Sequence, residues 1–227
     1  TEIYTLSLHD ALPISFFATQ FLKILSEENL IVYDFEKNSW SWDFANIEQK
    51  NITDNVLELL VDKSLKLPRP TQDVLKIAAC IGNRFNISLL SAVYGQDMHE
   101  TKLVLEPAIF EGLLLPLDHL HYKFVHDRIQ QAVYSTIPND KKNNFHFQIG
   151  KLLYTNIPEN KKEKRIFDIV NQLNYGISFL SENNFESTIL AKLNYQAGLK
   201  AKLSSAYEPA YKYLKIAETL LPANSWT

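Results

Sequence analysis

Apolar residues recur along most of this chain at the three- and four-residue spacing of an amphipathic α-helix. In the central part this spacing predicts helices over 71–82, 87–95, 99–114 and 128–137. Towards the C-terminus it predicts helices over 140–156, 165–180, 187–205 and 207–221. Two further helical stripes cover 16–30 and 51–68. The pattern therefore predicts a mainly α chain.

Two regions alternate apolar and polar residues with a period of two, which indicates β-strands. In 31–44, two apolar runs flank the polar turn 36–39 and predict a β-hairpin with three aromatic residues on one face. These aromatics are Trp40, Trp42 and Phe44. The second region predicts strands over 113–117 and 121–125.

The order of these elements predicts the domain organisation. Three helices, a β-hairpin and a trailing helix in succession are typical of a winged helix, which we expect over 67–137. The later helices have lengths suited to antiparallel pairs, so we expect an array of α-helical hairpins over 138–227. Residues 16–66 then form the end of a preceding helical region, with the hairpin 31–44 inside it.

The last two predicted helices match the tetratricopeptide repeat, which we place at 191–224. Ala197 and Gly198 stand at the close-packing positions of the first helix, and Pro222 stands at the closing proline. The small–large–small positions of the second helix are Ala210, Leu214 and Ala217. Asn194 replaces the usual tryptophan, so the repeat is degenerate.

Composition places the chain in an ordinary class. Of its 227 residues 46% are hydrophobic and 22% charged, and the net charge of −3 gives no bulk attraction to nucleic acid or anionic membranes. The single cysteine, Cys80, excludes an internal disulfide and fits a reducing compartment. No apolar run is long enough to span a bilayer. We therefore expect a cytoplasmic protein with no membrane segment.

Motifs for catalysis are absent from the sequence. It contains no GxxxxGK[ST] or GxGxxG phosphate-binding loop, no GxSxG, no HExxH and no CxxC. Cys80 lies in an apolar helix stripe, which favours a buried hydrophobe over a nucleophile. His119, His121 and His126 lie close together, but no cysteine or carboxylate cluster completes a metal site. We expect no enzyme activity, cofactor or metal in this chain.

A winged helix raises the question of DNA binding. Its third helix usually enters the major groove with basic or amide side chains. Here the predicted helix 99–114 carries Glu100, Glu106 and Glu111 against Lys102 alone. Phosphates would repel such a helix, so DNA is not the partner we expect.

The pair His126-Asp127 stands where the second strand of the wing meets the trailing helix. In the simpler interpretation Asp127 caps that helix, together with Gln130, and His126 only packs under the wing. In the functional interpretation His126 donates a hydrogen bond from Nε2 or Nδ1 to a phosphate. Spacing alone favours the simpler interpretation.

Several phrases of residues 16–227 resemble the predicted-ATPase region of very large bacterial signalling proteins. The phrases are FFATQFLK, WSWD, ITDNVLELL, LPRPTQDVLKIAACIGNRF, EGLLLPL, YKFVHDRIQQAVYS, RIFDIVNQLN and LLPANSW. In this family a Ser/Thr-kinase-like domain precedes a STAND-class ATPase, and helical repeats, a GAF sensor domain and often a histidine kinase come after it. The resemblance covers only the end of the ATPase module and the start of its repeats.

The resemblance implies a role for VHD at 125–127. In related STAND proteins a similar His-Asp pair touches the β-phosphate of bound ADP and holds the closed state. His126 would then sense the nucleotide state, and Asp127 would orient it or cap the helix. ATP or ADP with Mg²⁺ would bind elsewhere in the parent protein. The partners implied are the rest of the parent chain, with its ATPase core, sensor and kinase domains, and proteins bound by the repeats.

Two alternatives remain open at this stage. Transcription regulators of the maltose-activator type share the ATPase and repeat parts and bind DNA through a separate C-terminal domain. The chain could also belong to a repeat scaffold whose nucleotide site is inactive. The type of domain beyond Thr227 would decide the first alternative, and a phosphate-binding loop upstream would exclude the second.

The first fifteen residues, TEIYTLSLHDALPIS, do not fit the family. The match stops abruptly at Phe16, and reverse translation of residues 1–15 gives a DNA sequence that resembles a short-read sequencing adapter. We therefore expect these residues to be an artefact fused to a truncated gene.

Overall fold

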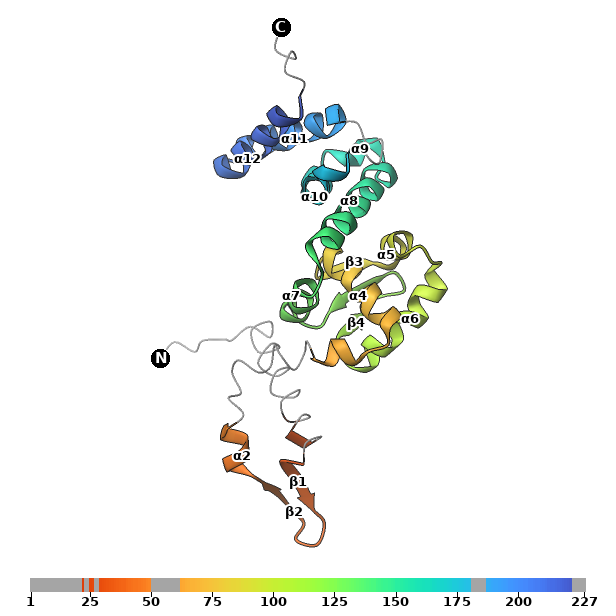
Figure 1. Cartoon of the computed structure of the whole chain (residues 1–227), viewed down its shortest axis with the longest axis vertical. Helices are drawn as coiled ribbons and strands as arrows, with labels where there is room; N and C mark the ends of the chain where they lie inside the picture. The colour runs from red at the N-terminus through yellow and green to blue at the C-terminus, as the bar shows by residue number, and fades with distance from the viewer. Residues whose placement is uncertain (1–21, 23–24, 27–28, 50–61, 181–186, 222–227) are drawn as a thin grey trace, which may run out of the picture.

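The computed structural model describes residues 22, 25–26, 29–49, 62–180 and 187–221 (Figure 1). The predicted helix 16–30, the first part of 51–68 and the adapter-like segment therefore lie mostly or wholly outside the described residues. The described part is mainly helical with small antiparallel β-sheets, which confirms the expected mainly α class.

The central module alternates helices and strands in a fixed order. It consists of α4 (Arg69–Ile81), β3 (Arg84–Asn86), α5 (Ile87–Tyr94), α6 (Met98–Phe110), β4 (Leu114–Pro116), β5 (His121–Phe124) and α7 (Asp127–Ser135). Its three strands form one antiparallel sheet in the order β3-β5-β4. Strand β5 thus occupies the centre of the sheet, and the chain leaves it directly into α7.

One strand of this sheet was missed by the sequence pattern. Residues 84–86 pair with 121–123, so the sheet has three strands and not only the predicted hairpin. Three residues are too few to show a period of two. The Asn86 side chain then accepts a hydrogen bond from the Ser88 N–H at 2.7 Å and caps α5.

The core of the module lies between the sheet and the helices. Val74, Leu75 and Ala78 on α4 meet Phe124 of β5 and Ile129 of α7 in one buried cluster. The predicted apolar face of 71–82 is therefore the buried face of α4. The helix begins two residues earlier than predicted because Pro70 fits its first turn, where no backbone donor is needed.

The N-terminal hairpin has the predicted pairing. Strands β1 (Ile31–Asp34) and β2 (Ser39–Trp42) are antiparallel, with Tyr33 opposite Trp40 and Ile31 opposite Trp42. The expectation that Phe44 continues this strand face is wrong, because Phe44 begins the short helix α2 (Phe44–Gln49). The Asp43 carboxylate accepts from the Asn46 N–H at 3.1 Å and so ends the strand by capping this turn.

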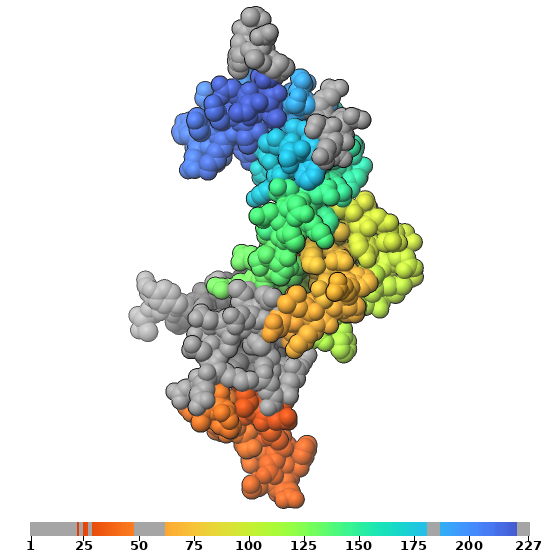
Figure 2. All heavy atoms as spheres, viewed as in Figure 1, coloured from red at the N-terminus to blue at the C-terminus, as the bar shows by residue number. Residues whose placement is uncertain are grey.

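Two antiparallel helix pairs follow the central module. The first is α8 (Asn139–Asn156) with α10 (Ile166–Tyr175), and the second is α11 (Ser187–Leu203) with α12 (Tyr207–Leu220). Figure 2 shows the two pairs following one another away from the central module. The predicted single helix 165–180 is wrong at its end, since a 3₁₀ turn, η1 (Ile177–Phe179), follows Gly176. The predicted connection 157–164 contains the one-turn helix α9 (Glu159–Lys162).

A glycine lets the two helices of each pair approach closely. A Cβ on Gly150 of α8 would lie 2.7 Å from Cγ of Leu173 in α10, and one on Gly198 of α11 would lie 2.6 Å from Cγ of Leu214 in α12. Such separations are shorter than any normal carbon contact. Both pairs therefore use the same device, a glycine on the first helix that receives a leucine of the second.

We expect Gly150→Ala to destabilise the chain although alanine favours helices by about 1 kcal/mol. The added methyl group meets the Leu173 side chain and its backbone nitrogen, at 2.9 Å, so the helices must separate. Overpacking of this kind costs about 1–3 kcal/mol, measurable as a lower urea midpoint. Lys151→Ala, at the exposed neighbouring position, is the control. An unchanged or raised midpoint for Gly150→Ala would contradict the close approach.

Candidate functional site

The candidate site residue His126 is the N-cap of α7. Its Nδ1 accepts a hydrogen bond from the backbone N–H of Arg128 at 3.1 Å, and the side chain is half-buried. An Nδ1 that accepts carries no proton, so the proton of the neutral ring sits on Nε2. Of the two predicted donor atoms, Nδ1 thus acts as an acceptor within the chain in this conformation.

Asp127 has a different place from the one expected. It is the first residue of α7 and exposed, and His126 rather than Asp127 caps the helix. The capping-box partner is also wrong, because the Gln130 Nε2 donates to the Ala79 carbonyl of α4 at 2.7 Å. A carboxylate at the first position still favours the helix through its dipole. In this structure His126, and not Asp127, therefore caps α7.

The sheet holds His126 in place from the N-terminal side. The Phe124 N–H donates to the Asn83 carbonyl at 2.9 Å, and the Val125 N–H donates to the Leu113 carbonyl at 3.1 Å. Phe124 and Ile129, on the two sides of the pair, are both fully buried. His126 is thus fixed to the middle strand of the sheet and to the first turn of α7 at once.

The other end of α7 contacts the first helix pair through a buried histidine. The His146 ring on α8 is 5% exposed, and its Nε2 lies 2.8 Å from the Tyr134 hydroxyl of α7. Its Nδ1 lies 2.6 Å from Oε1 of Gln172 in α10, whose Nε2 donates to the Cys80 carbonyl at the end of α4 at 3.1 Å. These side chains join α7, α8, α10 and α4.

Each hydrogen bond of this junction has one donor and one acceptor that follow from the Gln172 amide. Since the Gln172 amide donates to Cys80, its oxygen faces His146 and accepts, so His146 Nδ1 must donate. Nε2 of the neutral ring then accepts from the Tyr134 hydroxyl. Burial lowers the pKa of His146, and the hydrogen bond to Gln172 opposes that effect only in part. The junction therefore holds one tautomer of a neutral imidazole.

Three neighbouring residues of α10 reach other parts of the helical array. Asn174 exchanges two hydrogen bonds with the buried Asn194 of α11, both at 2.9 Å. Asn171 accepts from the Tyr213 hydroxyl of α12 at 2.7 Å. Leu173, between these positions, packs on Gly150 of α8. With Gln172, four consecutive residues of α10 contact different neighbours.

The remaining candidates do not form a site. Cys80 is buried, as predicted, and burial raises the pKa of its thiol to about 12. His121 Nδ1, at the start of β5, pairs with Asp118 at 2.9 Å, whereas His126 binds the first turn of α7. Among the residues that the structure describes, no group of three or more histidine, cysteine, aspartate or glutamate side chains is suited to a metal ion.

The sequence pattern did not predict the hydrogen-bonded junction around His146. Its members are far apart in the chain, and each occurs in a helix whose apolar stripe gave the only signal. A polar residue on an apolar stripe, as at His146 and Gln172, was the one indication available.

Comparison with known proteins gives a distant relative. Hybrid signal transduction histidine kinase G of Dictyostelium discoideum is 28% identical over 259 aligned positions, which include 91% of this chain and 8% of that protein. The chain thus spans a small part of the relative's length. No family model and no solved structure matches the chain. Within the described residues, no helix is long and apolar enough to cross a membrane.

We expect His126→Ala to lower the free energy of unfolding by about 1 kcal/mol, because the first turn of α7 loses its cap. Asparagine is a good N-cap, so His126→Asn should stay within about 0.5 kcal/mol of the original protein. Urea unfolding measures both. Equal losses for the two variants would show that the imidazole contributes something other than the cap.

The His146 junction predicts a loss of stability in acid. The folded pKa of His146 lies below its ordinary value of 6.5, so the unfolded chain binds the proton first. The contribution of neutral His146 to the free energy of unfolding is fully present above that ordinary value. It falls as the pH drops towards the folded pKa, by at most about 1.4 kcal/mol per pH unit. Urea midpoints at about pH 7.5 and pH 5.5 measure the slope.

His146→Gln should flatten this pH slope, because the titrating ring is gone. His119→Gln is the matched control, since His119 is exposed in the connection between β4 and β5. A slope that survives His146→Gln would assign the acid sensitivity to other groups.

Proposed function

We propose that this chain is the coupling segment of a large STAND-type ATPase signalling protein. In this proposal residues 67–137 are a winged helix that senses the nucleotide state of a neighbouring ATPase core, and residues 138–227 begin a tetratricopeptide-like array that passes this state to a kinase output. One observation carries the proposal: α7 has His126 at its first turn and Tyr134, near its end, hydrogen-bonded to the helical array.

The central module supports the winged-helix assignment. Its order of helix, strand, two helices and two strands, with β5 in the middle of the sheet, is the order expected of a helix-turn-helix with a β-wing and supports this proposal. The wing is the connection between β4 and β5, where Asp118 caps the turn by accepting from Leu120 and His121 at 2.7 and 2.8 Å.

The face of α6 argues against DNA as its ligand. On this helix Leu103, Glu106 and Phe110 are exposed, and Phe110 is 87% exposed. Acidic and apolar side chains do not match the phosphates of a major groove. A protein surface, such as the ATPase core of the same protein, suits this face better. The transcription-regulator alternative is not affected by α6, because its DNA-binding domain is a separate one.

Sensing would proceed through the proton on His126 Nε2. A phosphate oxygen accepts such a hydrogen bond, and a bond to a charged acceptor contributes about 1.5–3 kcal/mol. Loss of the contact when ADP leaves would release the first turn of α7. Because α7 is a single rigid helix of nine residues, a shift of its first turn reaches Tyr134 and the His146 junction. The free energy of this contact would set how far bound ADP shifts the equilibrium between the two states.

The relative supports the signalling context, since its name is that of a hybrid histidine kinase. The proposed cofactors, ATP or ADP with Mg²⁺, belong to the ATPase core, because the sequence of this chain has no phosphate-binding loop. The chain itself is proposed to be non-catalytic.

His126→Asn in the longer protein, ATPase core included, is the decisive variant because it keeps the cap of α7 and removes the Nε2 donor. We expect ADP to dissociate about tenfold or more faster and kinase output to change, in line with the loss of one hydrogen bond to a charged group. Radiolabelled ADP release and phosphorylation assays measure the two. His119→Asn is the control.

Unchanged ADP release and output in His126→Asn would overturn the sensing role. The chain alone should bind neither ATP nor ADP in calorimetric titration. Tight binding of Mg²⁺-ATP by the chain alone would contradict the proposed location of the nucleotide site.

A further inference from the structure

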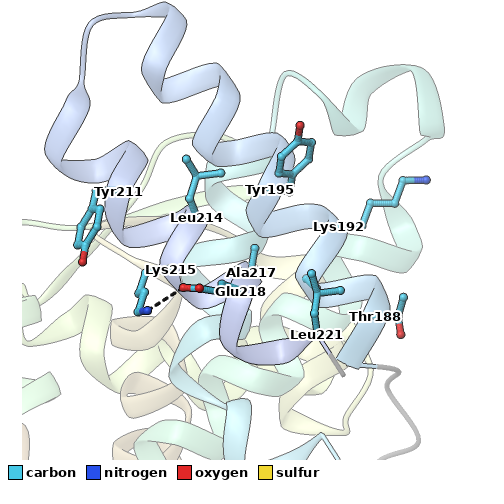
Figure 3. A pocket seen from close by; sticks show the side chains of 10 residues that line it. Thr188, Lys192, Tyr195, Tyr211, Leu214, Lys215, Ala217, Glu218 and Leu221 are labelled. Atoms are coloured by element: carbon cyan, nitrogen blue, oxygen red, sulfur yellow. Dashed lines mark hydrogen bonds and ion pairs between the residues drawn. The ribbon is translucent and has the colours of Figure 1, made fainter. Parts of the chain in front are cut away.

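Helix α12 borders two hollows of the helical array. The groove between α11 and α12 has a volume of about 460 Å³ and a mainly apolar surface (Figure 3). The second hollow lies between α10 and α12, has a volume of about 440 Å³ and is named the α10–α12 pocket below. Of the two, only the α10–α12 pocket is lined by amide side chains, so the two hollows suit different ligands.

The α10–α12 pocket combines apolar surface with hydrogen-bond donors. Tyr175 of α10 and Pro209 and Ile216 of α12 supply the apolar surface. Asn171 of α10 and Lys212 of α12 supply the donors. Among the described residues, none that lines this pocket is acidic. The lining therefore matches a ligand that has both a negative charge and an apolar part.

A tyrosine fixes the direction of the Asn171 amide. The Tyr213 hydroxyl donates to Asn171 Oδ1 at 2.7 Å, and the Tyr213 ring packs on Phe167 with 5.7 Å between the ring centroids. Because Oδ1 accepts this bond, Nδ2 is the atom of the amide that remains for a ligand. No residue in the described part of the chain accepts a hydrogen bond from Nδ2. Asn171 thus offers two oriented N–H groups.

Lys212 adds a positive charge to these donors. Its Nζ lies 2.7 Å from Oε1 of Glu208, one turn earlier on α12, and the two side chains are 68% and 78% exposed. An ion pair this exposed contributes at most about 1 kcal/mol. An ammonium group has three N–H donors, so Lys212 can bind a second carboxylate beside Glu208 or exchange one for the other at small cost.

We propose that the α10–α12 pocket binds an acidic peptide segment of a partner protein. A side-chain carboxylate of this segment accepts hydrogen bonds from Asn171 Nδ2 and Lys212 Nζ, and a neighbouring apolar side chain packs on Tyr175 and Ile216. A carboxylate has only acceptors, so it leaves no donor unsatisfied against this lining. The proposal adds a chemical class of partner to the proposed function and does not depend on nucleotide sensing, so either proposal can fail alone.

The pocket adjoins the His146 junction. The Tyr175 ring stacks on the His146 ring, with 4.4 Å between the centroids and 20° between the planes, and Tyr175 is 56% exposed. Asn174, which also lines the pocket, exchanges hydrogen bonds with Asn194. A segment bound in the pocket therefore touches α10 at the residues through which this helix contacts α8 and α11.

Two short peptides test the proposal, acetyl-Leu-Glu-Leu-amide and acetyl-Leu-Gln-Leu-amide. They differ only in a carboxylate against an amide of the same shape. Each is titrated into the chain, and the NMR signal of the Asn171 side-chain amide reports binding. We expect the glutamate peptide to bind about tenfold or more tightly than the glutamine peptide, because its hydrogen bonds involve a charged acceptor.

Three variants locate the peptide. Asn171→Asp keeps an acceptor for the Tyr213 hydroxyl but replaces the Nδ2 donors by a negative oxygen, so the glutamate peptide should bind at least about tenfold more weakly. Lys212→Gln should weaken it as well. Lys215→Gln is the matched control, since Lys215 pairs with Glu218 at 2.7 Å on the same helix but lines the groove between α11 and α12 (Figure 3). Circular dichroism checks that each variant folds.

Three results would overturn the proposal. The first is that neither peptide shifts the Asn171 signal, and the second is that the two peptides bind equally well. The third is that Lys215→Gln weakens the glutamate peptide as much as Lys212→Gln does, which would show attraction to any exposed lysine. The two lysine variants decide the outcome even if Asn171→Asp does not fold, because both lysines are exposed.

Discussion

Hydrogen bonds from the amide side chains of α10 join this helix to its neighbours in several directions at once; Gln172 and Asn174 are half-buried, and Asn171 is exposed. In the run from Asn171 to Asn174, each amide reaches a different element, and the leucine between them fills the space left by Gly150. Asn194, the partner of Asn174, is fully buried, and a buried amide left without a partner costs about 1–3 kcal/mol, so a rotation or slip of α10 is unfavourable. Helix α10 thus contributes to the placement of both helix pairs, together with the packing of α8 on the central module.

Polar contacts of this kind select an arrangement that apolar packing alone leaves open. Leucine and alanine surfaces tolerate small slips between helices, whereas the reciprocal bonds of Asn174 with Asn194 exist in one register only. The glycine–leucine contacts set the distance within each pair, and the amides set the order between pairs. In the helical array, different residues therefore set the distance between the helices of a pair and the register between the two pairs.

The sequence predicted what depends on local periodicity. The faces of α4 and α12, the hairpin around the turn 36–39 and the close-packing role of Gly198 are encoded within single segments, and the structure contains all of them. Strand β3 was missed because its partner β5 is distant in the chain. The cap of α7 was misassigned because an aspartate beside a histidine is the commoner cap, and the sheet decides which residue stands outside the helix. The His146 junction depends on contacts between helices, which periodicity does not report.

A histidine cap differs from the usual aspartate or serine cap in the atom that accepts the hydrogen bond, which is a ring nitrogen and not an oxygen. The Arg128 amide is satisfied only while Nδ1 of His126 keeps its lone pair. An imidazolium has a proton on both nitrogens, so it cannot accept from that amide. The cap and the proposed hydrogen bond from Nε2 therefore need the same tautomer, with Nδ1 as the acceptor and the proton on Nε2. One ring can thus serve the helix and a ligand at the same time.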